Sequence, residues 1–292
     1  MVSFEQQGAP SIGAGRPLAV VVGVGDMGMA VARRFGQHHR LLLADLSAQR
    51  LDAVAAQLRA EGSEVETAVC DVTDADSVAA LAQCVDRLGP LRALIHVAGL
   101  SPSLAPWQTI LRVNLIGPQR MMAAMLERAV PGTAAIFVAS LAGHALQPSP
   151  ELQRVLAAPL APDFLDRLVQ VNGGEPSPGL SYSLSKQALI RLCRQQAPAW
   201  GARAARVVSV SPGMIATLQG RTEFDSNPAK RVRFEKTPLQ RQGTLHEIVD
   251  AIEFLASERA SFISGTDLLV DGGLDAATQL DGPTTLVGSD AG

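Results

Sequence analysis

The chain has 292 residues and a formal net charge of −3, and 47% of its residues are hydrophobic. This composition supplies enough apolar side chains for a sizeable folded core and differs from that of disordered chains. The small negative charge gives no electrostatic reason to expect a nucleic acid or an anionic membrane as a partner. No apolar run reaches the roughly 18–20 residues that a membrane-spanning helix needs.

Cysteine usage points to a reducing compartment. Cys70, Cys84 and Cys193 are widely spaced and form no CxxC pair. This pattern favours neither a disulfide framework nor a zinc site, so we expect no metal and a cytoplasmic location. Residues 1–17 lack the basic start and apolar run of a signal peptide, and we expect a disordered tail there.

From residue 18 onward, short apolar runs alternate with longer segments of helical periodicity. Runs rich in Val, Leu and Ile and too short for helices are expected to be strands buried on both faces: 18–23, 41–45, 65–70, 93–98, 135–140 and 207–211. Helices are expected between them at 27–38, 48–61, 75–88, 107–129 and 183–197, with Asp74 as the N-cap of the third. Repeated β-α units predict a doubly wound α/β fold, a parallel sheet with helices on both faces, in a single domain over 18–274.

Two stretches interrupt this rhythm. Residues 144–180 are rich in proline but carry apolar side chains at helical spacing: Leu152, Leu156, Phe164, Leu165 and Leu168. A segment this long inside a compact domain is commonly a lid, a binding loop or a small helical insertion. Residues 218–236 are polar and charged, and we expect a substrate loop. Residues 275–292 are expected to form a C-terminal tail that is mobile or crosses to another subunit.

A glycine-rich motif joins the first predicted strand to the first helix, in the form GxGxxG: Gly23-Val24-Gly25-Asp26-Met27-Gly28. Glycines permit a tight turn and close backbone approach, so the helix N-terminus can face a pyrophosphate. Asp45 ends the next strand, 22 residues after Gly23. A carboxylate there can accept both ribose hydroxyls and repels a 2′-phosphate, which favours NAD over NADP. The alternative for Asp45 is a helix cap or a solvated loop residue.

Tyr182 and Lys186 stand one helical turn apart and therefore on one helix face. Tyr182 is the single tyrosine of the chain. A free phenol has a pKa of about 10 and is a poor base at neutral pH, but a nearby ammonium stabilises the phenolate and lowers that pKa. The pair is therefore a candidate acid/base unit, and an ordinary surface pair is the alternative.

Further ordered elements give residues 18–273 a resemblance to the short-chain dehydrogenase/reductase family. They are Asp71-Val72 after the third strand, Ala98-Gly99 after the fourth, Asn114, Ser140 after the fifth, the run Pro212-Gly213-Met214-Ile215-Ala216-Thr217, and a C-terminal stretch ending in Val270-Asp271-Gly272-Gly273. The resemblance implies a Rossmann fold and NAD as cofactor. The residues that it places at the cofactor are Gly23, Gly25, Asp26, Met27, Gly28, Asp45, Leu46, Asp71, Val72, Ala98, Gly99, Tyr182, Lys186, Pro212, Gly213, Ile215 and Thr217.

The resemblance also implies a division of labour. Tyr182 would exchange a proton with the substrate oxygen, and Lys186 would bind the nicotinamide ribose and tune Tyr182. Ser140 would hydrogen-bond the substrate oxygen, and Asn114 would hold a water that completes a proton relay. Because the family pairs helices near 107–129 and 181–197 between subunits, a homotetramer or dimer is expected.

The chain departs from the family pattern at three places. Asp26 stands where a glycine is common, and His96-Val97 replaces an asparagine pair, with His96 expected to be a packed structural residue. Ser140 and Tyr182 are 42 residues apart, whereas most members have about a dozen residues between them. We expect the extra residues, 144–180, to wall or cover the substrate pocket, and an oligomer contact is the alternative.

The sequence therefore predicts an oxidoreductase that interconverts a secondary alcohol and a ketone. The apolar residues of the 144–180 segment suggest a hydrophobic, steroid-like or alicyclic substrate, although such residues more commonly form core. A non-catalytic NAD-binding redox sensor or scaffold is the alternative. A methyltransferase with the same glycine turn is a further one. Ser140, Tyr182 and Lys186 favour the enzyme over both.

Overall fold

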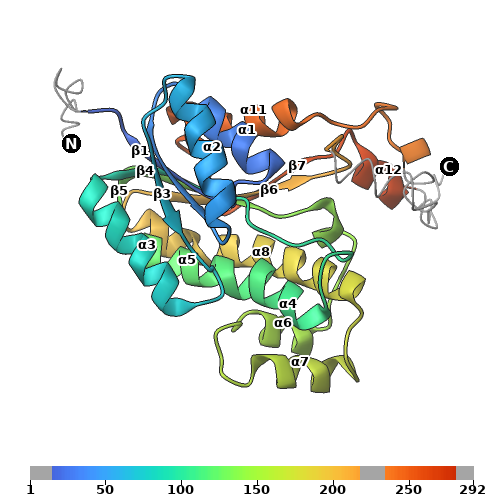
Figure 1. Ribbon diagram of the computed structural model, residues 1–292. Coiled ribbons are helices and arrows are strands. Elements are labelled where there is room, and N and C mark those ends of the chain that lie inside the picture. Colours follow the sequence, from blue (N-terminus) through green and yellow to red (C-terminus); the bar gives the residue numbers. More distant parts are fainter. Residues whose placement is uncertain (1–14, 218–233, 281–292) are drawn as a thin grey trace, which may run out of the picture.

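Seven parallel strands form one sheet in the part of the chain that the computed structural model describes, residues 15–217 and 234–280 (Figure 1). They are β1 (Leu18–Val22), β2 (Arg40–Asp45), β3 (Val65–Val69), β4 (Leu91–His96), β5 (Ala129–Val138), β6 (Arg206–Pro212) and β7 (Asp267–Val270). Their order is β3-β2-β1-β4-β5-β6-β7, so the chain starts inside the sheet and winds outward toward each edge in turn. The predicted doubly wound α/β fold in a single domain is confirmed.

Helices cover both faces of this sheet, because each parallel connection must cross over it. One face carries α1 (Asp26–Phe35), α2 (Ala48–Ala60) and α11 (Leu245–Ala256), and the other carries α3 (Ala75–Leu88), α4 (Trp107–Leu111), α5 (Gly117–Leu126) and α8 (Pro178–Gly201) (Figure 1). Asp74 caps α3 as predicted, and its carboxylate accepts a hydrogen bond from the Ser77 amide at 3.0 Å.

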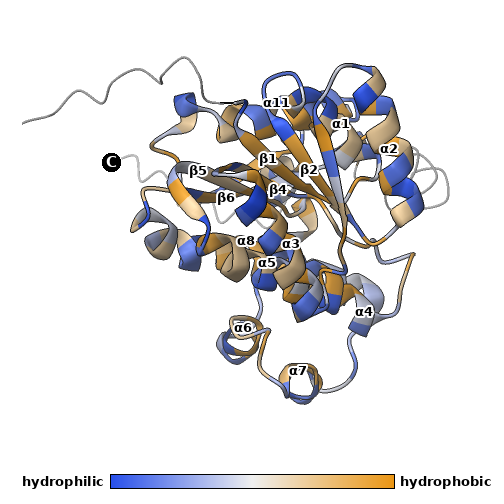
Figure 2. Cartoon of the chain, turned by 60° about the vertical axis from the view of Figure 1, so that its left-hand side comes forward, coloured by the Kyte–Doolittle hydropathy of each residue, from blue (hydrophilic) through white to orange (hydrophobic). Residues whose placement is uncertain are grey.

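The central strands feed two separate cores, because alternate side chains point to opposite faces of a sheet. In β1, Ala19 and Val21 pack into the core beneath α1, α2 and α11, whereas Val20 and Val22 pack into the core beneath α3, α5 and α8. Burial on both faces explains why the central strands are continuous apolar runs in the sequence. The edge strand β3 differs, because Glu66, Thr67 and Val69 are exposed, so the prediction that this strand is buried on both faces is wrong. Strand β1, for example, has the orange colour of hydrophobic residues in Figure 2.

The predicted helix at 107–129 consists of three pieces. α4 gives way to a π-helical turn at Arg112–Ile116, and α5 then ends at Leu126. The chain enters β5 at Ala129, earlier than the predicted strand 135–140. Its first residues include Gly132, with φ of +85°, and Thr133, whose hydroxyl donates to the Leu91 carbonyl at 2.6 Å. This irregular start lacks the apolar pattern by which the rest of the strand was predicted.

Helix α8 is longer at both ends than the predicted 183–197. The Ser177 hydroxyl accepts a hydrogen bond from the Leu180 amide at 3.1 Å, and Pro178 occupies the first turn, where its missing N–H costs nothing. The helix also continues through Pro198 to Gly201. Fully buried Trp200 lies in this last turn, and its packing holds the turn despite the proline.

The 144–180 segment is mostly helical. It contains α6 (Pro150–Leu156) and α7 (Phe164–Asn172), which lie below α4 and α8 and far from the strands (Figure 1, Figure 2). Its apolar side chains at Leu152, Leu156, Phe164 and Leu168 are buried in the core shared with α8. The suggestion that these residues face a substrate is therefore wrong, and they form core.

Other expected segments lie partly outside the described residues. The 1–17 tail is described only from residue 15, and the 218–236 loop only from residue 234. The expected C-terminal tail begins as helix α12 (Leu274–Leu280), in which the Asp275 amide donates to Asp271 Oδ2 at 2.7 Å. Among the described residues, no helix is both long and apolar enough to span a membrane, and no cluster of three metal-binding side chains occurs.

Candidate active site

A large pocket opens at the carboxyl ends of the strands, where ligands bind in open α/β sheets. Its volume is about 1440 Å³, larger than the roughly 300–1,000 Å³ of sites for drug-sized ligands. All the predicted site residues except Asn114 line it: Gly23, Gly25, Asp26, Met27, Gly28, Asp45, Leu46, Asp71, Val72, Ala98, Gly99, Ser140, Tyr182, Lys186, Pro212, Gly213, Ile215 and Thr217. The fold therefore brings together side chains that are spread over nearly 200 residues of sequence.

The glycine turn needs its glycines for different reasons. Gly23 has φ of +88°, and a Cβ there would lie 2.6 Å from the Ala98 backbone nitrogen. A Cβ on Gly28 would overlap the Gly23 carbonyl oxygen. A Cβ on Gly25 meets no atom within 4 Å, so open space lies in front of the N-terminus of α1. This exposed backbone fits the pyrophosphate of a dinucleotide.

Asp45 closes the far end of the same turn. Its side chain is 7% exposed, and the carboxylate accepts the Val24 amide at 2.8 Å and the Ser47 amide at 2.9 Å. Arg50 Nη1 donates to both carboxylate oxygens, at 3.2 and 3.3 Å. Arg50 also lines the pocket, although it was not among the predicted site residues. The available signal was its position in the first turn of the helix that follows Asp45.

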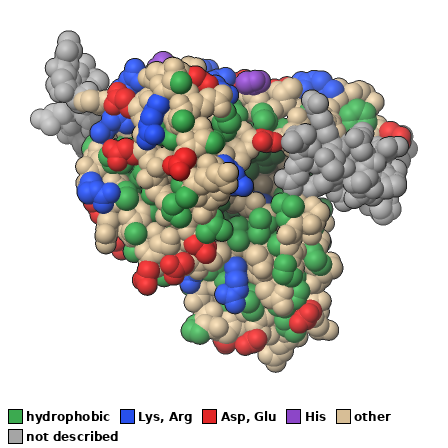
Figure 3. All heavy atoms as spheres, in the orientation of Figure 1, with side chains coloured by type: hydrophobic (Ala, Val, Ile, Leu, Met, Phe, Trp, Pro, Cys, Tyr) green, Lys and Arg blue, Asp and Glu red, His purple; other side chains and the backbone are tan. Residues whose placement is uncertain are grey.

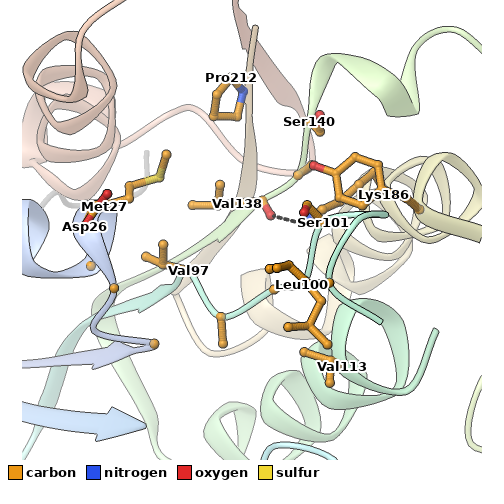
Figure 4. Close-up of a pocket in the computed structure, with 18 of the residues that line it drawn as sticks. Asp26, Met27, Val97, Leu100, Ser101, Val113, Val138, Ser140, Lys186 and Pro212 are labelled. Atoms are coloured by element: carbon orange, nitrogen blue, oxygen red, sulfur yellow. Dashed lines mark hydrogen bonds between the residues drawn. The ribbon is translucent and has the colours of Figure 1, made fainter. Parts of the chain in front are cut away.

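Lys186 is the buried cation of the site. Its ammonium donates to the Val138 carbonyl at 2.9 Å and lies 5.7 Å from the centroid of the Tyr182 ring (Figure 4). Burial lowers the pKa of Lys186 to about 8, because the charged form is desolvated. The predicted i,i+4 pair therefore faces the pocket and is not a surface pair. In Figure 4, Lys186 and Ser140 lie across the pocket from Asp26 and Met27.

Ser140 begins a tight turn directly after β5. Its hydroxyl accepts the Ala142 amide at 3.2 Å, and its carbonyl accepts the Gly143 amide at 2.9 Å, in a 3₁₀ turn over Leu141–Gly143. The turn thereby holds Ser140, at the carboxyl end of the strand, with its half-buried side chain at the pocket wall.

Asn114 lies behind the pocket rather than in its lining. Its side chain is fully buried in the π-helical turn, where Oδ1 accepts the Leu100 amide at 2.7 Å and Nδ2 donates to the Leu100 carbonyl at 2.9 Å. These two bonds fasten the loop after β4 to the helix. The amide side chain is thus engaged by protein backbone.

His96 is a packed residue, as expected. Its ring is buried and stacks on Phe137 with centroids 5.4 Å apart. Burial lowers the pKa of the His96 imidazole to about 3, and the charge of Lys186 acts in the same direction. The ring is therefore neutral at physiological pH.

The remaining lining is mostly apolar. It includes the apolar side chains Leu100, Leu104, Val113, Leu141 and Met214, with polar side chains at Ser101, Ser103, Thr109, Arg112 and Gln242. Figure 3 shows a hollow on this face with hydrophobic side chains gathered below it. Of residues 144–180, only Gly179 lines the pocket among the described residues.

Two family models match the chain in succession. The model described as short chain dehydrogenase matches residues 17–152, and the model described as Enoyl-(Acyl carrier protein) reductase matches residues 168–275. A short-chain dehydrogenase/reductase from Alternaria brassicicola is 30% identical over 87% of this chain and 94% of its own length. The chain belongs to the short-chain dehydrogenase/reductase family.

Other relatives are named for their reactions. Galactitol 2-dehydrogenase (L-tagatose-forming) from Cereibacter sphaeroides is 30% identical over 87% of this chain and 93% of its own. D-threitol dehydrogenase from Mycolicibacterium smegmatis is 29% identical over 88% and 92%. A short-chain type dehydrogenase/reductase from Mycobacterium ulcerans, of known structure, matches with a TM-score of 0.73 and 21% identity, covering 89% of this chain and 90% of that one. The family makes this protein an oxidoreductase that binds a nicotinamide cofactor.

Proposed function

We propose that this protein is an NAD(H)-dependent oxidoreductase that interconverts a secondary alcohol and a ketone. The observation that carries the proposal is the pocket itself. Tyr182, Lys186 and Ser140 line the same cavity as the glycine turn and Asp45. A non-catalytic NAD-binding protein needs a cofactor pocket, but it has no use for a phenol, a buried ammonium and a hydroxyl at one end of it.

Each side chain takes a step that its surroundings support. A nicotinamide dinucleotide, when bound, supplies or accepts the hydride. The Tyr182 phenol transfers a proton to or from the substrate oxygen, and the Lys186 ammonium, 5.7 Å from its ring, stabilises the phenolate. The Ser140 hydroxyl hydrogen-bonds the substrate oxygen and stabilises charge that develops there. We also propose that Asn114 takes part in the proton relay. Its side chain lies behind the pocket and is hydrogen-bonded to the Leu100 backbone.

NAD is proposed over NADP because of Asp45 and Asp26. The buried Asp45 carboxylate lines the adenosine end of the pocket, and Asp26 adds a second negative charge at the glycine turn. A 2′-phosphate would meet both, whereas the ribose hydroxyls of NAD can donate to Asp45. Arg50 opposes this preference, because its guanidinium lies on the same carboxylate.

The substrate is proposed to be an alcohol with a hydrophobic, alicyclic or steroid-like body. Support comes from the apolar lining at Leu100, Leu104, Val113, Leu141 and Met214. A polyol is the second candidate, favoured by the names of two relatives and by hydroxyl side chains in the lining at Ser101 and Ser103. We also propose a cytoplasmic location, in keeping with three free thiols, and a homo-oligomer.

Nicotinamide absorbance tests the proposal directly. A panel of alicyclic alcohols, polyols and the matching ketones is offered with NAD(H) and with NADP(H), and NADH affinity is measured separately by fluorescence. Turnover with NAD(H) is expected, and Tyr182→Phe is expected to lose about 10²–10⁴-fold in kcat while it keeps wild-type NADH affinity. NADH binding without turnover on either substrate class would favour the non-catalytic alternative.

A further inference from the structure

Ser140 directly follows β5, where the Ala139 amide donates to the Val210 carbonyl at 2.7 Å, and the far end of its turn is held at Gly143 and His144. On one side it packs directly on helix α8, because a Cβ at Gly143 would lie 2.8 Å from the Lys186 carbonyl carbon and from the Gln187 backbone nitrogen. On the other side the turn ends at His144, whose amide donates to the Leu141 carbonyl at 3.0 Å. The far end of the Ser140 turn is therefore held in part by whatever holds His144.

His144 reaches across to the edge of the sheet. Its Nε2 lies 2.8 Å from Oδ2 of Asp267, the first residue of β7. The Asp267 side chain is only 2% exposed, whereas that of His144 is 24% exposed. Neither residue lines the pocket. This contact joins the end of the Ser140 turn to a strand more than 120 positions away in sequence.

The Asp267 carboxylate is built into β6 and β7 by other bonds. Its Oδ1 accepts the Ser209 hydroxyl at 2.5 Å and the Ser211 hydroxyl at 3.0 Å, and Ser209 is its direct neighbour in the strand pairing. Both serines are fully buried. Buried groups with several hydrogen bonds resist displacement, so Asp267 is a fixed point and His144 is the side chain that connects the turn to it.

We propose that His144 is a positioning residue for the reaction, holding the Ser140 turn in register with Tyr182 through its hydrogen bond to Asp267. The inference rests on the proposed function, because it assigns Ser140 a role at the substrate oxygen. A reacting group displaced by 1 Å can lose about 10²-fold in rate. His144 therefore influences kcat from outside the pocket, without touching substrate or cofactor.

A double-mutant cycle separates positioning from simple structural support. The variants are His144→Phe, Ser140→Ala and the double variant, and His144→Gln supplies the conservative change, since its amide can donate where Nε2 does. Ser209→Ala is the matched control, because it removes another donor from the same carboxylate but leaves the turn attached. For each, kcat, KM, NADH affinity and melting temperature are measured.

Positioning predicts a split among these measurements. His144→Phe should lower kcat about tenfold or more, with KM and NADH affinity changed less than about twofold, and His144→Gln should recover most of the loss. In the Ser140→Ala background His144→Phe should cost nothing further, because the group that it positions is gone. Ser209→Ala should lower the melting temperature and leave kcat within about twofold.

Additive losses in the cycle, or an equal fall of kcat in Ser209→Ala, would overturn the assignment and make His144 a structural residue. If His144→Phe does not fold, His144→Asn takes its place in the cycle, since its shorter side chain falls short of Asp267. A wild-type protein that binds NADH but turns over no alcohol or ketone would refute the proposed function, and the inference would fall with it.

Discussion

The glycine turn belongs to the regular β-α rhythm and the 144–180 segment interrupts it, and the two differ in what they build. Three of the six residues of the turn are glycines, and at Gly25 the backbone faces open space in front of α1. The segment is rich in apolar side chains, and they are buried in the core beside α8. This difference shows that the carboxyl ends of the strands determine where the pocket lies. The added 144–180 segment, although long, contributes only Gly179 to the lining.

Glycine variants give the largest expected effect. Gly28→Ala places a Cβ on the Gly23 carbonyl oxygen, so the turn must open, and both stability and NADH affinity should fall, the affinity by more than about tenfold. Gly25→Ala is the matched variant, because its Cβ meets no protein atom within 4 Å. It should keep the wild-type melting temperature and lose NADH affinity alone, since its Cβ would occupy the space proposed for the pyrophosphate. Equal NADH affinity in Gly25→Ala and wild type would contradict that placement.

The 144–180 segment should respond in the opposite way. Leu168 is fully buried on α7, so Leu168→Ala should reduce the free energy of unfolding by about 2–5 kcal/mol. NADH affinity and KM should stay within about twofold, because only Gly179 of this segment lines the pocket. Leu160→Ala, at a side chain that is 46% exposed, is the control and should cost less than about 0.5 kcal/mol. Urea unfolding measures both changes in stability. A KM change well above twofold in folded Leu168→Ala would show that α7 reaches the substrate.

The sequence predicted the turn better than the segment for a physical reason. Gly23, Gly25 and Gly28 act through local backbone geometry, and Tyr182 and Lys186 are one helical turn apart, so short spacings are enough to find them. Arg50 stands only five residues after Asp45, so a short spacing could have identified it too. The contact of His144 with Asp267 depends on the fold bringing distant elements together. The same limit applies to Leu168, because helical periodicity marks an apolar face but does not say whether protein or substrate covers it.

Helix α8 packs against the 144–180 segment and carries Lys186 into the pocket that the glycine turn also lines. Lys186 allows a test of the effect of pH on stability. Because burial lowers the pKa of Lys186 to about 8 from a usual value of 10.5, the unfolded chain holds one more proton than the folded one between these pH values. The free energy of unfolding should therefore rise with pH across this window, by at most about 1.4 kcal/mol per pH unit. Below about pH 8 both states are protonated and this contribution is constant.

Lys186→Met supplies the reference for that slope. The variant keeps the side-chain length without the charge, so the difference in unfolding free energy between wild type and variant should grow from pH 8 to pH 9.5 by about 1.5 kcal/mol in favour of wild type. Urea unfolding at both pH values measures it. A difference that is independent of pH would mean that Lys186 is solvated in the folded protein.

Substitution of Arg50 is expected to have the smallest effect, a change in cofactor affinity at the Asp45 end of the pocket. The Asp45 carboxylate already accepts the Val24 and Ser47 amides and two contacts from Arg50, so ribose hydroxyls must compete with the guanidinium. The Arg50 side chain is 54% exposed, and such pairs are worth about 0–1 kcal/mol.

Arg50→Gln should therefore tighten NADH binding by up to about fivefold, and weaken NADPH binding by a similar factor, because a 2′-phosphate loses its cation. Arg16→Gln, whose arginine pairs with Glu64 outside the pocket, controls for the change in net charge and should alter neither affinity. Fluorescence titration of both reduced cofactors, at one fixed salt concentration, measures the shift. Equal weakening of NADH and NADPH in Arg50→Gln would mean that Arg50 braces Asp45 for the ribose and does not compete with it.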